Sequence, residues 1–136
     1  MVRFRFSPLF LLFSFLVNAQ VQSPDSFLGH TLGTHFTRHH EVVDYYQHLE
    51  DNSAGIKLHP YGKTNEGRLL QLAFISSPEN IENLEAIRKK HLQNSGIEKG
   101  ETNDEKVIVW LIYNVHLNES LSTESSIKTA NALLTK

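Results

Sequence analysis

Hydrophobic positions recur with the period of an α-helix in three stretches of the chain. The predicted helices cover residues 36–51, 78–92 and 122–134. Within each, apolar residues fall three or four positions apart and form one stripe. The stripes consist of Val42, Val43, Tyr46 and Leu49; of Ile81, Leu84, Ile87 and Leu92; and of Ile127, Ala130 and Leu134. We therefore expect each helix to bury one face against the rest of the protein.

Other stretches have the patterns of β-strands. Residues 56–61 alternate between apolar and polar, and 69–76 follow after a turn over 62–67 that has glycine at both ends, so the two should form a hairpin. Residues 107–113 are almost continuously apolar, which is typical of a central strand covered on both faces. The order helix, hairpin, helix, buried strand, helix predicts an α/β fold. Two polar stretches are expected to be irregular: residues 20–34 and 94–106.

Residues 1–19 have the pattern of a secretory signal peptide. Arg3 and Arg5 precede a short apolar run, and Ala19 ends a segment that signal peptidases accept, with cleavage before Gln20. The run is too short to span a bilayer as a helix, which takes about 20 residues. The alternatives are an uncleaved N-terminal anchor and a buried strand. We expect an exported protein, periplasmic or secreted, with no membrane span once the signal is removed.

Composition narrows the function classes. A chain of 136 residues has room for one small domain. Its 13 basic and 15 acidic residues give a net charge of −2, which offers no electrostatic basis for binding nucleic acid. It has no cysteine, which excludes disulfides, thiolate metal ligands and a cysteine nucleophile. Burial of apolar surface must therefore provide the stability.

One pair of residues could carry chemistry. His116 and Glu119 directly follow the predicted strand 107–113, and open α/β sheets place their ligands beyond the carboxyl ends of such strands. Imidazole and carboxylate three residues apart can reach one metal ion, and both are common zinc ligands. On spacing alone, an ordinary surface pair remains the alternative.

Two motifs resemble the carboxypeptidase A-like zinc metallocarboxypeptidases. Residues 61–70 read Tyr-Gly-Lys-Thr-Asn-Glu-Gly-Arg-Leu-Leu and are similar to the Y-G-x-T-x-E-G-R-P-L hairpin of the family. Residues 113–119 resemble its N-x-H-G-N-E block, and 122–124 resemble the start of the helix that follows. The lead-in, at 27–29 and 36–40, resembles that of exported bacterial members. The resemblance implies that residues 20–136 are the N-terminal part of a three-layer α/β/α catalytic domain with a mixed sheet.

The resemblance also implies a function, namely zinc-assisted hydrolysis of C-terminal peptide bonds in peptides or proteins. It makes His116 and Glu119 two of three protein ligands to Zn²⁺, although Leu117 stands where the family usually has glycine. The family's third ligand, its substrate-binding residues and its general base come later than Lys136, so no catalytic residue is expected in this chain. We expect it to be inactive alone.

Two other readings stay open. The chain could be a truncated or degenerate relative without catalytic activity that acts as a small exported binding domain. Alternatively, its His-x-x-Glu could be incidental, and it would then bind no metal. The sequence His40-Glu41 begins like a zincin helix motif but lacks the second imidazole, so an exposed helical pair is expected there. Glu66 and Arg68 are expected to stabilise the hairpin, and Trp110 to lie in the core.

Overall fold

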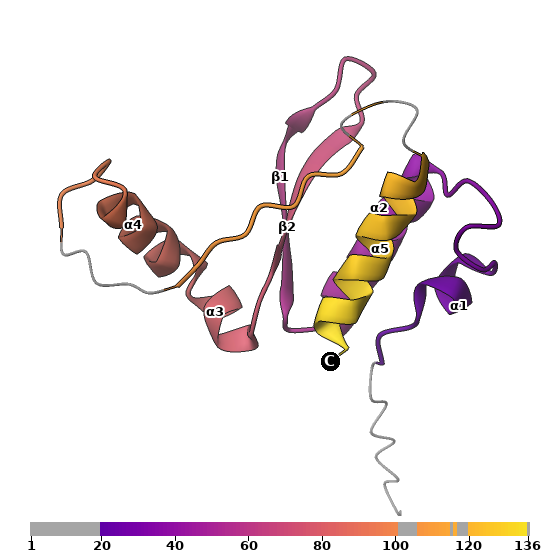
Figure 1. The fold of residues 1–136 in the computed structure, drawn as a ribbon, viewed down its shortest axis with the longest axis horizontal. Helices are drawn as coiled ribbons and strands as arrows, with labels where there is room; N and C mark the ends of the chain where they lie inside the picture. The colour runs from indigo at the N-terminus through magenta and orange to yellow at the C-terminus, as the bar shows by residue number, and fades with distance from the viewer. Residues whose placement is uncertain (1–19, 101–105, 115, 117–119, 136) are drawn as a thin grey trace, which may run out of the picture.

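The computed structural model describes residues 20–100, 106–114, 116 and 120–135. Its elements, in chain order, are α1 (Pro24–Leu28), α2 (His39–Asn52), β1 (Ile56–Lys63), β2 (Leu69–Ile75), α3 (Pro78–Glu82), α4 (Leu84–Asn94) and α5 (Ser120–Leu134). Helices α2 and α5 pack together on one side of the β1–β2 hairpin, and α4 lies far out on the other side (Figure 1). Helices combined with a sheet confirm the predicted α/β class. None of the described helices is long and apolar enough to cross a membrane.

The core lies where α2, α5 and β1 meet. Its buried hydrophobic residues are Tyr45 and Leu49 of α2, Ile56 and Leu58 of β1, and Ile127 and Ala130 of α5. These positions include members of the first and third predicted stripes, so the periodic pattern identified the faces of α2 and α5 that pack inward. Each large buried side chain contributes roughly 1.5–3 kcal/mol.

The polar lead-in over residues 20–34 was predicted to be irregular. It instead contains the short helix α1. The Ser23 hydroxyl accepts a hydrogen bond from the Ser26 amide (3.3 Å), and Pro24 occupies the first turn, where its missing N–H costs nothing. Gly29 ends the helix with a φ of +73°, in the left-handed region that favours glycine. The cap residues mark the two ends of this helix, and Phe27 and Leu28 pack against the core.

The hairpin forms in the predicted place. Strands β1 and β2 pair antiparallel, with Ile56 opposite Ile75, and the register shifts by one residue between Pro60 and Gly62. In the connecting turn the Thr64 amide donates to the Arg68 carbonyl at 2.8 Å. Glu66 and Arg68, expected to stabilise the hairpin, form an ion pair at 2.8 Å in this turn. Both groups are well exposed, so this ion pair adds little to the stability.

The single helix predicted over residues 78–92 is wrong in two respects. It is broken at Asn83, whose backbone leaves the helical region (φ −109°, ψ 21°) and whose side-chain amide donates to the Glu79 carbonyl at 2.8 Å. An asparagine that bonds its own preceding turn competes with helix continuation. Neither α3 nor α4 has a buried residue. The four residues of their stripe are only half-buried, although α3 contacts β1.

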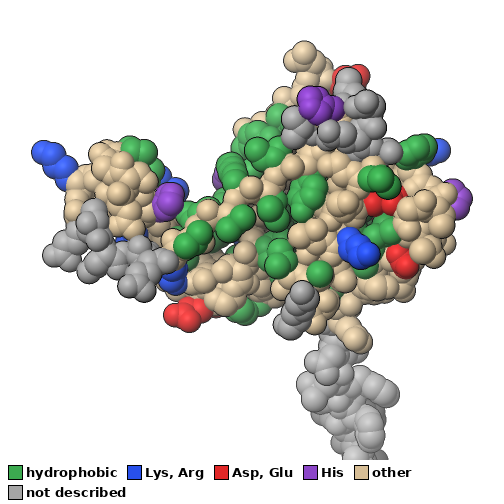
Figure 2. All heavy atoms as spheres, viewed as in Figure 1, with side chains coloured by type: hydrophobic (Ala, Val, Ile, Leu, Met, Phe, Trp, Pro, Cys, Tyr) green, Lys and Arg blue, Asp and Glu red, His purple; other side chains and the backbone are tan. Residues whose placement is uncertain are grey.

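The central strand predicted over residues 107–113 is also wrong. Residues 106–114 form no strand, and positions 107–112 are between 52% and 85% exposed. Figure 2 shows hydrophobic side chains at the surface along this extended segment, between α4 and the main body. A strand buried on both faces needs strands at its edges and layers above and below it. The described sheet has only two strands, and the segment pairs with neither of them.

Trp110 gives a direct test of whether this segment is exposed to solvent, because it is the single tryptophan of the chain. Its side chain is 62% exposed rather than in the core. We expect red-shifted tryptophan emission in the folded protein and quenching by acrylamide close to that of the urea-unfolded chain. Blue-shifted emission that acrylamide quenches poorly would show that the segment is buried in solution.

Candidate functional site

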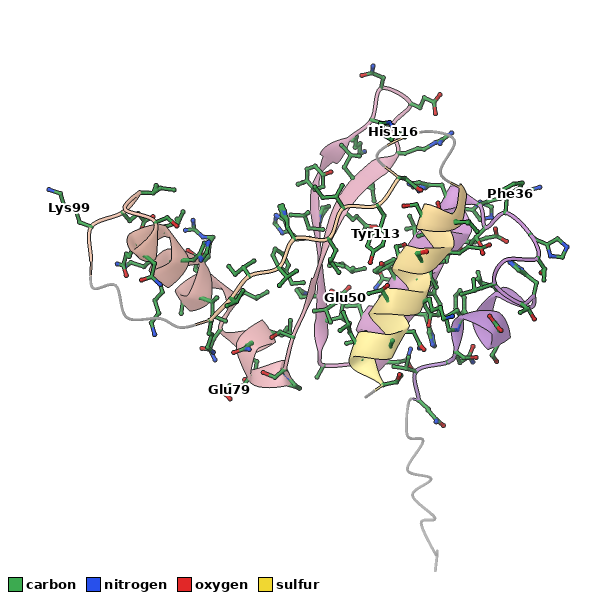
Figure 3. All side chains as sticks on the ribbon, viewed as in Figure 1. Phe36, Glu50, Glu79, Lys99, Tyr113 and His116 are labelled. Carbon is green, nitrogen blue, oxygen red and sulfur yellow. The ribbon has the colours of Figure 1, made fainter. Side chains whose placement is uncertain are left out.

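The two predicted zinc ligands belong to the connection between the extended segment and α5. His116 is described and exposed, whereas Leu117 and Glu119 lie outside the described residues, as does the predicted signal peptide. Figure 3 shows His116 at the end of the molecule where the hairpin turn also lies. The structure therefore presents one of the two predicted ligands to solvent, and the prediction for the pair remains untested.

Asn114 holds the beginning of this connection against α5. Its φ of +57° lies in the left-handed region, which asparagine tolerates better than most residues. The Asn114 backbone amide donates to the Ser122 hydroxyl at 2.8 Å, and its side-chain amide donates to the Thr123 hydroxyl. The residues before and after the predicted ligand pair are thus joined directly. This restricts where His116 can lie relative to the helix.

Glu124 holds the same end of α5 against the lead-in. Its side chain is buried (7% exposed) and accepts hydrogen bonds from the Gly33 amide and, at 3.1 Å, from the Thr37 hydroxyl. From the sequence, Glu124 belongs to the motif at residues 122–124 and has no predicted role. Its position beside Ser122 and Thr123 was the available signal that it has a role. No periodicity along the chain, however, identifies a hydrogen-bond partner 91 positions away.

A shallow pocket adjoins Glu124 at the start of α5. Its lining comes from the lead-in and from α5: Gly33, Thr34, His35, Phe36, Leu121 and Glu124. Phe36 is 80% exposed and Leu121 is 73% exposed, so much of the lining is apolar and open to solvent. The ring of His35 stands edge-on to that of His30, with centroids 5.2 Å apart. The arrangement offers an apolar contact surface near the predicted metal-binding connection.

The His40-Glu41 pair has the structural position expected of it. His40 is exposed on the first turn of α2, and the Glu41 carboxylate accepts a hydrogen bond from the Arg38 amide at 2.6 Å. A carboxylate at this position satisfies an otherwise unpaired amide and interacts favourably with the helix dipole. Glu41 therefore helps to cap the start of α2. The helix begins at His39 rather than at residue 36 for this reason.

Tyr45 and Glu50 are among the ionisable groups of α2 whose pKa values are shifted. Burial raises the pKa of Tyr45 to about 12. The pKa of Glu50 is lowered, chiefly because its carboxylate accepts a hydrogen bond from the Leu58 amide at 2.8 Å. Both groups join α2 to its neighbours: the Tyr45 hydroxyl donates to the Gln22 carbonyl at 3.0 Å, and Glu50 contacts β1. These shifts are features of the scaffold.

The lowered pKa of Glu50 predicts a pH-dependent contribution to stability. Because the folded value lies below the ordinary 4.5, the stabilisation is present at neutral pH and is lost as pH falls below about 4.5, through the folded pKa. We expect Glu50→Gln to cost about 1 kcal/mol at pH 7 and less at pH 3. Urea unfolding of both proteins at the two pH values measures this difference. An equal loss at both would contradict the role assigned to the Glu50 charge.

The donor chemistry of the predicted site suits zinc, but the described residues do not complete it. Exposed imidazole together with carboxylate is a donor set that Zn²⁺ accepts. Among residues 20–100, 106–114, 116 and 120–135, however, no group of three His, Asp or Glu side chains is close enough to hold a metal ion.

Comparison with known proteins gives one finding. A family model described as zinc carboxypeptidase matches residues 42–136, a range that includes the hairpin, His116, Glu119 and α5. No match was found among curated proteins or among solved structures. The matched range covers well over half of the chain.

Proposed function

Because this chain belongs to the zinc carboxypeptidase family, we propose that it serves zinc-dependent hydrolysis of C-terminal peptide bonds. The observation that carries the proposal is the family match over residues 42–136, which contains both His116 and Glu119. When bound, zinc supplies a Lewis acid for the scissile carbonyl and lowers the pKa of a water nucleophile. The proposed substrates are peptides or proteins with an accessible C-terminus.

His116 and Glu119 are the proposed protein ligands. The exposed imidazole of His116 and the restraint of Asn114 against α5 support this assignment. Catalytic zinc sites generally take three protein ligands and leave one position open to water. With two assigned ligands, we propose that this chain binds zinc weakly and is inactive alone. The alternative is a non-catalytic relative that acts as a small exported binding domain.

Export is proposed from the signal-like sequence of residues 1–19. The contacts of Gln22 support a domain that begins close to Gln20, since the Gln22 amide donates to His48 Nε2 at 3.0 Å and its carbonyl accepts from Tyr45. We propose a periplasmic or secreted location for residues 20–136. N-terminal sequencing of the protein recovered from a secreting host should begin at Gln20. A sequence that begins at Met1 would contradict processing.

Zinc titration by calorimetry tests the ligand assignment. We expect measurable zinc uptake by the wild-type protein and its loss in a His116→Ala/Glu119→Ala variant, because two donors are removed together. The matched control is His40→Ala/Asp44→Ala, which removes an exposed histidine and carboxylate one turn apart on α2. Undiminished uptake in the His116→Ala/Glu119→Ala variant would place the metal elsewhere and would favour the binding-domain alternative.

A further inference from the structure

The lead-in carries a pair of histidine rings that have no part in the proposed function. His30 and His35 lie between α1 and α2, and their ring centres are 5.2 Å apart, with the ring planes inclined at 65°. The Nε2 atom of His30 is buried and has no hydrogen-bond partner among the described residues. A buried polar nitrogen without a partner is costly, so this atom needs a ligand that the described chain does not supply.

The hydrogen bonds of Thr34 determine which nitrogen of His35 is free to bind a ligand. The Thr34 hydroxyl donates its hydrogen to the Thr31 carbonyl at 2.7 Å. It also lies 2.9 Å from His35 Nδ1, and because a hydroxyl has only one hydrogen, it accepts this second bond from an Nδ1–H group. Neutral His35 therefore carries its hydrogen on Nδ1 and a free lone pair on Nε2. A hydrogen bond from the other ring nitrogen is typical of histidines that bind metal ions.

The backbone between the two histidines is held in place by its own amides. Consecutive amides at residues 32, 33 and 34 each donate a hydrogen bond, to acceptors in α1, in α5 and in the loop itself: the Asp25 carboxylate at 3.1 Å, the Glu124 carboxylate and the Thr31 carbonyl at 3.1 Å. Gly33 has a φ of +89°, in the left-handed region that favours glycine. Because the loop is already ordered, little chain entropy is lost when a ligand binds both rings.

We propose that His30 and His35 bind one divalent transition-metal ion, Cu²⁺, through their two Nε2 atoms. Two imidazoles at neighbouring positions of one ion, with metal–nitrogen bonds of about 2.0–2.1 Å, have ring centres roughly 4.5–5.3 Å apart. The observed separation of 5.2 Å lies in this range. Imidazole suits copper, nickel and zinc, and Cu²⁺ has the highest affinity of the three for a given site. No third His, Asp or Glu of the described residues joins the pair, so water completes the coordination.

Calorimetric titration with Cu²⁺ tests this site in a protein that carries His116→Ala/Glu119→Ala, which removes the proposed zinc ligands. We expect one tight equivalent of Cu²⁺. His35→Ala should weaken it by about tenfold or more, because losing a ligand costs no less than losing a partner that orients one. His35 is exposed, so this variant should fold. The matched control is His39→Ala/His40→Ala, which removes two exposed histidines of α2 and should leave the affinity within about twofold.

NMR of the histidine rings locates the site independently of calorimetry. In the metal-free protein, nitrogen-15 shifts should show the hydrogen of His35 on Nδ1. Substoichiometric Cu²⁺, which is paramagnetic, should broaden the ring signals of His30 and His35 before those of the other histidines. Thr34→Val removes the acceptor for the Nδ1 hydrogen and should weaken Cu²⁺ binding by about tenfold. Thr34→Ser keeps a hydroxyl and should restore the affinity.

The contrary outcomes are distinct from failure of the proposed function. Unchanged Cu²⁺ affinity in His35→Ala would overturn the inference, and the two rings would then pack edge-on without a ligand. Equal weakening in His39→Ala/His40→Ala would also overturn it, since scattered surface histidines would then account for the uptake. The proposed function is tested by zinc uptake that depends on His116 and Glu119. Its failure would leave Cu²⁺ binding at His30 and His35 standing, because the two sites share no residue.

Discussion

Replacing Leu49 with alanine is expected to lower the free energy of unfolding by about 2–5 kcal/mol. Leu49 has no exposed surface and belongs to the core shared by α2, β1 and α5. The change removes apolar surface from the core and leaves a cavity that neighbours on rigid elements fill only in part. Urea denaturation followed by circular dichroism measures the difference.

Leu133→Ala is the matched control for this change. Leu133 lies on α5 and is 54% exposed, so its truncation should cost less than about 1 kcal/mol. The double variant Leu49→Ala/Ile127→Ala should depart from additivity if the two side chains share one core. A cost for Leu49→Ala no larger than that for Leu133→Ala would contradict the core described here.

Replacing Ala130 with aspartate is expected to unfold the protein at neutral pH. Ala130 is 2% exposed and lies on the face of α5 that joins the core. An aspartate there places an unpaired carboxylate among apolar groups, and it also adds volume to a packed interface. The two effects together should cost several kcal/mol, comparable to the entire stability of a domain this small. The thermal unfolding transition should disappear or move far down in temperature.

The pH dependence of the stability of Ala130→Asp identifies the cause of its destabilisation. A buried aspartate without a partner has a raised pKa, so its penalty is largest at neutral pH and falls as the group becomes protonated in acid. The stability gap between Ala130→Asp and wild type should therefore narrow from pH 7 to pH 4. Ser125→Asp, at an exposed position of the same helix, should be nearly neutral. A gap that does not change with pH would point to steric overpacking instead.

Features specified by residues close together in the sequence were predictable. The apolar stripes of α2 and α5 follow from spacing within a few turns, and Leu49 and Ile127 are indeed buried. The hairpin follows from alternation and a glycine-bounded turn, in which Gly67 adopts a φ of +79°. The family membership was recognisable for the same reason, because its motifs over 61–70 and 113–119 are short and continuous.

Features that depend on a distant partner were not predictable. The run over 107–113 has the composition of a buried strand, but burial requires neighbouring strands and covering layers, and no described element supplies them. Helix α4 has an apolar stripe, yet none of its residues is buried. In both cases a local pattern indicates what a segment could bury, and only the surrounding chain decides whether it does.

The candidate site divides in the same way. The sequence by itself placed His116 and Glu119 three residues apart within the range that the zinc carboxypeptidase family model matches, because residue type and spacing are local properties. Only the tertiary structure joined Asn114 to Ser122 and Glu124 to Gly33 and Thr37. Hydrogen bonds between remote segments depend on how helices and loops pack, which spacing along the chain does not encode. The sequence thus supplied the candidate donors, and the packing of α5 determined how Asn114, which precedes them, is held.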